Sequence, residues 1–87
     1  MTSEPSLARV QAIVASVAGP HRTPNDTGPD TPLGEGGFWL DSVDMLETLI
    51  ACEAEFGIVF DQKTDLNDDR LVTVSTLLDL IRAKRSR

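Results

Sequence analysis

Apolar residues recur at spacings of three and four between Ser6 and Ala18. This spacing places them on one face of a helix, because an α-helix has about 3.6 residues per turn. Pro5 fits the first turn, and Gly19 followed by Pro20 ends the pattern. The stripe consists of Leu7, Val10, Ile13, Val14 and Val17. The pattern therefore predicts one helix with a single side that faces a core.

A second apolar pattern begins at Asp41 and Ser42 and runs to about Phe56, where Gly57 supplies a stop. Asp41 fits the N-cap, Ser42 the first helical position and Asp44 the third. At about 100° per residue, the apolar side chains of this helix divide into two stripes. One stripe is Met45, Leu49, Cys52 and Phe56, and the other is Val43, Leu46 and Ile50. One stripe is enough to pack a small bundle, so the second is either part of a wide buried face or a surface for a partner.

Thr73 reads as the N-cap of a last helix, because apolar residues follow it at positions i, i+3, i+4 and i+7. These residues are Val74, Leu77, Leu78 and Ile81. A short apolar stretch at residues 58–60 and an acidic connection at 61–70 precede this helix, and residues 65–69 fit one short helical turn. The pattern predicts an all-α fold of four helices with a short third helix.

The segment between the first two predicted helices, residues 19–37, is rich in proline and glycine. These residue types favour turns, so the segment reads as a loop. It is long for a connection in a compact domain, and such loops tend to be functional or mobile. It is not an interdomain linker, because the first helix could not bury its apolar stripe without the rest of the chain. Residues 1–87 therefore form a single domain.

The size and charge of the chain exclude several classes of function. Its 87 residues can bury a core of a few helices but not an enclosed active-site cavity, which argues against an enzyme. The net charge is −6, and residues 1–81 hold fourteen acidic but only four basic side chains. Such a chain repels nucleic acid and attracts basic protein surfaces. The other four basic residues lie in residues 82–87, which we expect to be a solvated, frayed helix end.

The sequence offers no catalytic or metal-binding constellation. His21 is the only histidine and lies in the proline-rich loop without a neighbouring nucleophile or metal ligand, so we expect a solvated side chain. Cys52 is the only cysteine and falls on the inner stripe, where a buried, inert thiol is expected. No apolar run approaches the roughly 20 residues of a membrane span, and no signal peptide is visible. These features favour a cytoplasmic protein, and the start at Met1 with the charged end favours a free-standing one.

Ser42 occupies a position suited to a covalent phosphate. A serine in the first helical turn has its hydroxyl beside unpaired backbone N–H groups and the positive end of the helix dipole. An Asp-Ser pair before an amphipathic helix is also a common helix start that needs no modification. From its position alone, both interpretations of Ser42 remain open.

Three segments in order resemble acyl carrier proteins. Residues 40–47, LDSVDMLE, closely resemble the Asp-Ser-Leu motif of that family. Residues 53–56, EAEF, match the acidic end of its second helix, and residues 72–74, VTV, match the start of its last helix. With the first helix and long loop, the resemblance covers about four-fifths of the chain. It implies a four-helix acyl-carrier-like bundle with a 4′-phosphopantetheine arm, derived from coenzyme A, on Ser42 and with Asp41 as its flanking motif residue.

The resemblance also implies a function without catalysis. Acyl groups would be held as thioesters on the arm and presented to partner enzymes, which include a phosphopantetheinyl transferase, acyltransferases and ketosynthases. In that family an acidic and apolar face of the second helix docks onto basic surfaces of partners. Here this docking face maps to Asp44, Leu46, Glu47, Ile50 and Glu53. The resemblance thus assigns the second stripe to partners, and we expect a monomer with no affinity for nucleic acid or membranes.

The chain departs from the family pattern at three places. Residues 36–39, GGFW, replace the usual approach to the motif, and Phe38 and Trp39 are expected either to pack over the base of the arm or to anchor the loop. Thr48 stands where a core leucine is expected, and the connection between Phe56 and Val72 is long. These departures favour a specialised pathway such as polyketide biosynthesis. The alternatives are a fatty-acid carrier, a peptidyl carrier, or an unmodified helical protein-interaction module.

Overall fold

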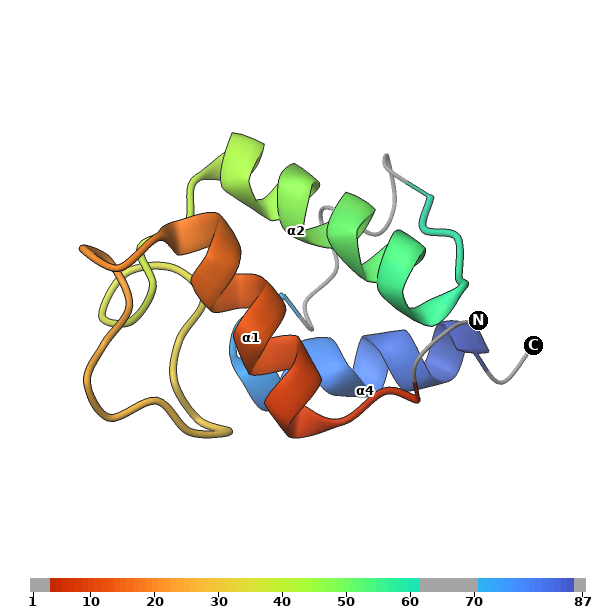
Figure 1. Cartoon of the computed structure of the whole chain (residues 1–87), viewed down its shortest axis with the longest axis horizontal. Coiled ribbons are helices and arrows are strands. Elements are labelled where there is room, and N and C mark those ends of the chain that lie inside the picture. Colours follow the sequence, from red (N-terminus) through yellow and green to blue (C-terminus); the bar gives the residue numbers. More distant parts are fainter. Residues whose placement is uncertain (1–3, 62–70, 86–87) are drawn as a thin grey trace.

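The computed structural model describes residues 4–61 and 71–85, and this part of the chain contains three helices and no strand (Figure 1). The helices are α1 (Leu7–Ala18), α2 (Ser42–Phe56) and α4 (Val74–Arg85). The predicted all-α class is confirmed, whereas the predicted bundle of four helices is not, because the described residues hold three. The short helix predicted at residues 65–69 lies outside the described residues.

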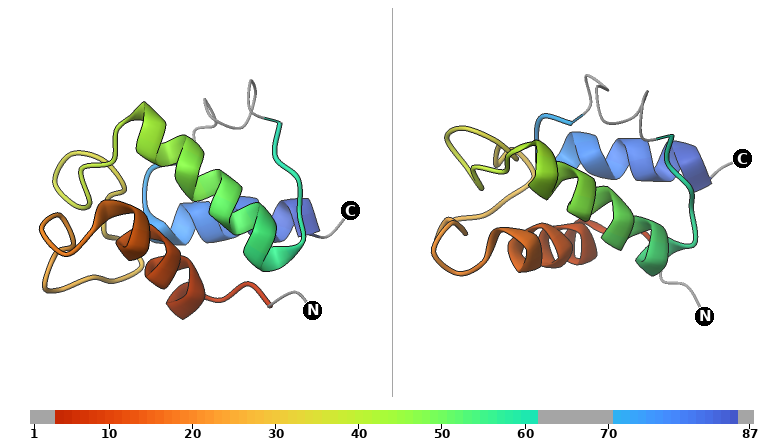
Figure 2. Two further views of the ribbon diagram at one scale, coloured as in Figure 1. Left: turned by 45° about the horizontal axis from the view of Figure 1, so that its top comes forward. Right: turned by 90° about the horizontal axis from the view of Figure 1, so that it is seen from above.

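The three helices enclose one apolar core. α1 packs against both α2 and α4, and the views in Figure 2 show α2 crossing the other two helices. The core combines side chains from all three helices with others from the first loop and from the segment after α2. Its largest fully buried members are Phe38, Phe56, Leu33, Leu49, Leu77, Leu80 and Ile81. Burial of these apolar side chains is the main driving force for folding.

Short-range hydrogen bonds cap the start of each helix. Pro5, predicted in the first turn of the first helix, instead precedes its N-cap residue, Ser6. Ser6 Oγ accepts from the N–H of the third residue of α1 at 3.3 Å. Asp41 Oδ1 accepts from Asp44 N at 2.8 Å, and Asp44 Oδ2 accepts from Asp41 N at 3.1 Å, which makes a reciprocal capping box. Thr73 Oγ1 accepts from Thr76 N at 3.2 Å, while Thr76 Oγ1 accepts from Thr73 N at 2.9 Å. The predicted N-caps Asp41 and Thr73 are confirmed.

The ends of α2 and α4 are tied together. Gly57 ends α2 in the left-handed conformation with φ of 65°, and its N–H donates to Glu53 O at 2.9 Å. Arg85 Nη1 donates to Phe56 O at 3.1 Å, and Arg85 Nη2 donates to Glu4 Oε1 at 2.9 Å. Residues 82–85, which belong to the segment expected to be a solvated helix end, continue α4, and Arg85 is bonded to the end of a neighbouring helix.

The first loop is held in place by the chain that leads into α4. Leu33 N–H donates to Val72 O at 2.8 Å, and Pro32 and Thr73 form an isolated antiparallel β-bridge. Leu33 and Phe38 are fully buried. The long loop is thus an ordered part of the fold, and its contacts fix the position at which α2 begins.

A tight turn inside this loop requires glycine at position 37. Phe38 N–H donates to Pro32 O at 3.0 Å, and Leu40 N–H donates to Leu33 O at 2.9 Å. These bonds press Gly37 against the Pro32 backbone, so that a Cβ at position 37 would overlap the Pro32 carbonyl. The close approach of the two backbone segments explains why a glycine stands at position 37.

Candidate functional site

Ser42 is the first residue of α2 and its side chain is exposed. The cap of α2 is made by Asp41, and the Ser42 hydroxyl makes no hydrogen bond with any other described residue. The unpaired N–H groups of the first turn and the positive end of the helix dipole lie beside it. A phosphodiester on Ser42 would therefore be accessible and electrostatically favoured, and its attachment would break no bond that holds the helix.

Arg22 joins the end of α1 to the start of α2. Its Nε donates to Ala18 O at 2.8 Å, and its Nη2 donates to Val17 O at 3.4 Å. Its Nη1 donates to Asp44 Oδ2 at 2.7 Å and to Trp39 O at 3.4 Å. The planar guanidinium thus binds the carbonyl end of one helix, the loop backbone before the second, and a carboxylate in the first turn of the second.

The contact with Arg22 sets the charge state of Asp44. Its hydrogen bond lowers the pKa of Asp44 below the ordinary value, and the Asp41 backbone N–H lowers it further. The same pair raises the pKa of Arg22. Asp44 is therefore a structural carboxylate, neutralised by its partner. Sequence reasoning missed Arg22, although a basic residue just after a helix end matches the negative end of the helix dipole.

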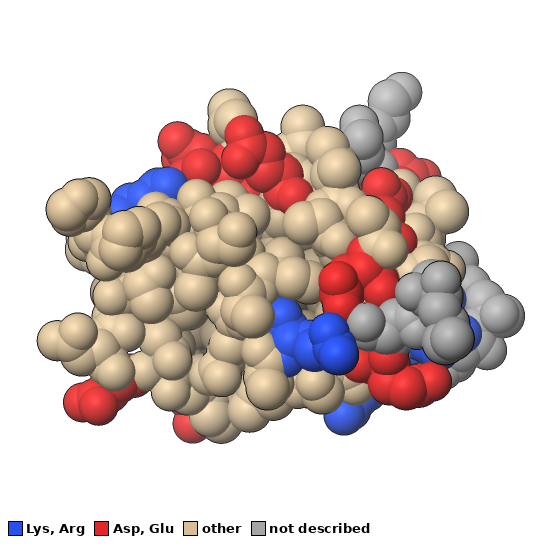
Figure 3. Space-filling view, viewed as in Figure 1, with Lys and Arg blue, Asp and Glu red and all other residues tan. Residues whose placement is uncertain are grey.

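The acidic side chains of the predicted docking face differ in what they contact. Asp44 binds Arg22, and Glu53 Oε2 accepts from Phe60 N at 2.8 Å. Glu47 is exposed and makes no hydrogen bond or ion pair with another described residue. Figure 3 shows acidic groups gathered over α2, with a basic group beside them near the start of the helix. Among the three predicted carboxylates, Glu47 is the one held out toward solvent.

The two apolar stripes of α2 are buried to different extents. On the second stripe Val43 is 64% exposed and Ile50 48%, while Leu46 is half-buried. On the first stripe Met45 is half-buried against the core. The fully buried members of the first stripe are Leu49, Cys52 and Phe56. The second stripe is therefore a partly exposed apolar surface on the helix that begins with Ser42.

Thr48 and Cys52 are the two residues of α2 in the core that carry a hydroxyl or a thiol group. Thr48 is buried, as its place in the pattern predicts, and its Oγ1 donates to Asp44 O at 2.8 Å. Burial raises the pKa of Cys52 to about 12, with a smaller contribution from the charge of Glu55. The Cys52 thiol is therefore neutral at physiological pH and enclosed by the core, as an inert cysteine should be.

The Phe-Trp pair before the motif is split between core and surface. Phe38 is fully buried and anchors the loop, which is one of the two roles expected of the pair. Trp39 is 56% exposed, and its backbone has φ of 57° in the left-handed region. Its N–H donates to Gly34 O at 2.9 Å, and its carbonyl accepts from Arg22. The indole is thus held at the surface, three residues before Ser42, on a fixed backbone.

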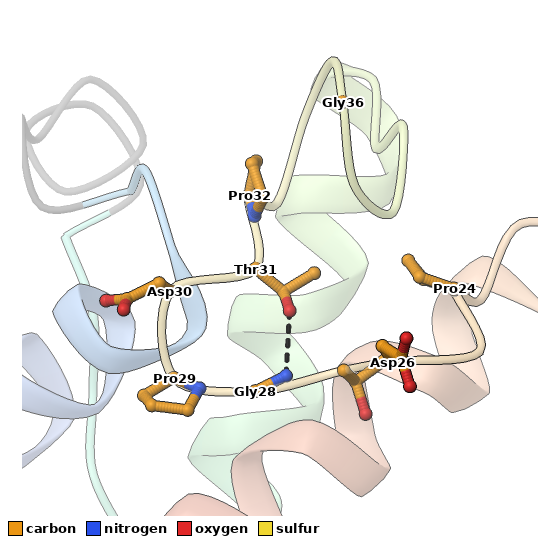
Figure 4. Close-up of a pocket in the computed structure, with 9 residues that line it drawn as sticks. Pro24, Asp26, Gly28, Pro29, Asp30, Thr31, Pro32 and Gly36 are labelled. Atoms are coloured by element: carbon orange, nitrogen blue, oxygen red, sulfur yellow. Dashed lines mark hydrogen bonds between the residues drawn. The ribbon is translucent and has the colours of Figure 1, made fainter.

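A hollow of about 500 Å³ lies within the first loop and is lined by residues of the segment 24–36. Figure 4 shows Thr31 turned toward Gly28, whose N–H donates to Thr31 Oγ1 at 2.7 Å, with Asp26 and Asp30 on either side. No residue of α2 lines this hollow. It is therefore separate from the surface around Ser42.

Within residues 4–61 and 71–85, no three His, Cys, Asp or Glu side chains come together in a way that could hold a metal ion. None of the helices in that part of the chain is long and apolar enough to cross a membrane. Comparisons of the chain with protein-family models, with curated proteins and with solved structures gave no match. The function must therefore be argued from the residues and their geometry.

Proposed function

We propose that this chain is an acyl carrier protein, which carries acyl intermediates as thioesters on a 4′-phosphopantetheine arm attached to Ser42. The observation that carries the proposal is the setting of Ser42. Its exposed hydroxyl has no structural role at the N-terminus of α2, while the adjacent Asp41 caps that helix. The resemblance of residues 40–47 to the family motif supports the same assignment.

The chemistry asks little of the carrier itself. A separate phosphopantetheinyl transferase would move the phosphopantetheine phosphate of coenzyme A onto Ser42 Oγ, forming the new phosphodiester bond as the nucleotide leaves. The proton of the hydroxyl goes to the transferase. The positive end of α2 would favour the resulting phosphodiester charge. The thiol at the end of the arm then forms the thioester, so the carrier contributes position and docking but no catalysis.

A polyketide pathway is the proposed setting, with acyltransferases and ketosynthases as partners in the cytoplasm and a monomeric carrier. The proposal rests on the three departures from the fatty-acid pattern, which are the Gly-Gly-Phe-Trp approach, Thr48 and the long connection between Phe56 and Val72. A peptidyl carrier is the weaker alternative because α2 is strongly acidic. An unmodified helical interaction module differs from all carriers in one measurable property, since it would never accept the arm.

The test is intact mass after incubation with coenzyme A and a broad-specificity phosphopantetheinyl transferase. The wild-type chain should gain one phosphopantetheine, and Ser42→Ala should gain none. Ser75→Ala is a matched control, because Ser75 lies in the first turn of α4 without the motif, and this variant should be modified like wild type. Absence of any gain in the wild-type chain would overturn the carrier function in favour of an unmodified module.

A further inference from the structure

Trp39 combines an exposed apolar side chain with a strained backbone, and neither property stabilises the fold. The residue is 56% exposed, and its backbone adopts φ of 57°, a conformation that favours glycine over residues with a Cβ. Glycine is used at positive φ elsewhere in this chain, at Gly19, Gly36 and Gly57. A tryptophan at such a position relieves no strain and fills no core. An observed backbone outlier of this kind points to a role for the side chain outside the fold.

The backbone of Trp39 is fixed from several sides. Its N–H is bound to Gly34 O, its carbonyl accepts from Arg22, and the preceding Phe38 is buried in the core. The indole therefore stands on a rigid support. A rigid aromatic side chain loses little conformational entropy when a partner covers it, which is why tryptophan is enriched among residues that dominate binding energy.

Trp39 lies close enough to Ser42 to be reached by an interface centred on that residue. Three residues of chain span at most about 11 Å, so the two Cα atoms are no farther apart than that. A standard protein interface buries about 800 Å² on each partner, a disc of roughly 16 Å radius. An interface centred on Ser42 therefore reaches Trp39.

Helix α2, which begins three residues after Trp39, exposes apolar and acidic side chains, and these indicate the chemistry of the partner. Val43 follows Ser42 directly and is 64% exposed, and Ile50 lies two turns farther along the same face with 48% exposed. Asp41 and Glu47 are exposed beside these apolar residues. We infer that Trp39 is the anchor of a docking surface, continued by Val43 and Ile50, for an enzyme that acts on Ser42 and presents an apolar recess bordered by lysine or arginine. The inference rests on the proposed carrier function.

The kinetics of arm attachment test this docking role. With a broad-specificity phosphopantetheinyl transferase and coenzyme A, Trp39→Gly should raise the KM for the carrier about tenfold and leave kcat within about twofold. Trp39→Phe should raise KM by no more than about threefold, because a rigid apolar ring remains. Val59→Ala is the matched control, since Val59 is an exposed apolar residue beyond the end of α2, and its KM should equal that of wild type.

The melting temperature separates docking from a structural role. Glycine removes the strain at φ of 57°, so Trp39→Gly should melt no lower than wild type while its KM rises. A structural role would instead lower the melting temperature and slow loading together, which would overturn the inference. An unchanged KM in Trp39→Gly, with normal modification of wild type, would overturn the docking role alone. Failure of wild type to accept the arm would overturn the carrier function as well.

The fluorescence of Trp39, the only tryptophan in the chain, distinguishes other occupants of the surface. In the purified, arm-bearing carrier without enzyme, the emission should remain at the wavelength of a solvent-exposed indole. A blue shift caused by the arm alone would assign the surface to the arm and overturn the inference. A dimer in sedimentation equilibrium that Trp39→Gly abolishes would assign it to a second copy of the chain, with the same consequence.

Discussion

Arg22 Nη1 lies 2.7 Å from Asp44 Oδ2, so a side chain of the first loop is bound to the first turn of the helix that presents Ser42. The same guanidinium binds the last carbonyls of α1. A single side chain therefore links the end of α1, the loop and the start of α2. This contact also means that Asp44 cannot be treated as a free docking charge.

The first prediction concerns the pH dependence that this ion pair causes. The hydrogen bond from Arg22 lowers the pKa of Asp44 in the folded state, so the stabilisation is present above the unfolded pKa and is lost as pH falls through the folded pKa. Acid should therefore lower the melting temperature of wild type between about pH 5 and about pH 3 more than that of Asp44→Asn. Thermal unfolding of both proteins, monitored by circular dichroism at each pH, measures this difference. Equal acid sensitivity of the two proteins would contradict the role given to the pair.

The second prediction concerns the contact between Gly37 and Pro32. A methyl group at position 37 would overlap the Pro32 carbonyl, so Gly37→Ala must push apart two segments of the loop. We expect a loss of about 1–3 kcal/mol in the free energy of unfolding, measured by urea denaturation. Gly34→Ala is the control, because nothing lies within 4 Å of a Cβ there. Similar losses in both variants would show that the loop packs differently.

The third prediction separates Ser42, the proposed attachment residue, from the cap residue Asp41 beside it. Ser42→Ala should change the free energy of unfolding by no more than about 0.5 kcal/mol, because the exposed hydroxyl holds nothing in the fold. Asp41→Ala should lower it by about 1 kcal/mol, because the N-cap bond to Asp44 N is lost. Urea denaturation of the two variants gives the comparison. A larger loss in Ser42→Ala than in Asp41→Ala would mean that Ser42 is itself the structural residue.

The fourth prediction concerns the buried thiol of Cys52. Burial raises the pKa of Cys52 to about 12 in the folded protein. As pH rises, the thiol therefore loses its proton in the unfolded chain before it does so in the folded protein. The stability linked to this group is therefore complete below about pH 9 and falls as pH rises toward 12, by up to about 1.4 kcal/mol per pH unit. Cys52→Ala should show a smaller decrease in the free energy of unfolding between about pH 8 and pH 10.5. Rapid alkylation of folded wild type at neutral pH would contradict the burial.

The fifth prediction distinguishes Glu47 from Glu53. Glu47→Lys should slow loading by partner enzymes about threefold to tenfold at low salt, and the difference should shrink as salt screens the attraction. Asp79→Lys makes the same change of charge on α4 and should have a smaller effect. Glu53→Ala should instead lower the free energy of unfolding by about 1 kcal/mol, because the hydrogen bond from Phe60 N is lost. A loading rate of Glu47→Lys that matches wild type at every salt concentration would remove Glu47 from the docking face.

Local patterns in the sequence predicted the helices and their starts with few errors. Asp41 and Thr73 could be identified as caps because each bonds to the backbone three residues later, a contact that depends on short-range spacing alone. The burial of Leu49, Cys52 and Phe56 followed from helical periodicity for the same reason. The short third helix, predicted at residues 65–69, stays a prediction because those residues lie outside the described part of the chain.

The contacts that the sequence did not predict arise where distant parts of the chain meet. The contact of Asp44 was missed because the sequence does not show that Arg22, in a loop, reaches the same turn of α2. The contact of Arg85 was missed because its acceptor, Phe56 O, belongs to another helix. The positive φ of Trp39 is held by contacts with Gly34 and Arg22. Nothing in the sequence indicated this conformation, because tryptophan rarely adopts a positive φ.

The bridge between Pro32 and Thr73 has a consequence for when the Ser42 site can form during synthesis. The ribosome makes the chain from its N-terminus, so the loop that leads to Ser42 emerges long before its backbone partners near Thr73. Until the start of α4 has left the ribosome, the peptide groups around Leu33 have no acceptor at Val72. Under the proposed function, Ser42 of a nascent chain should thus be a poor substrate for modification until the residues around Thr73 have emerged and paired with the loop.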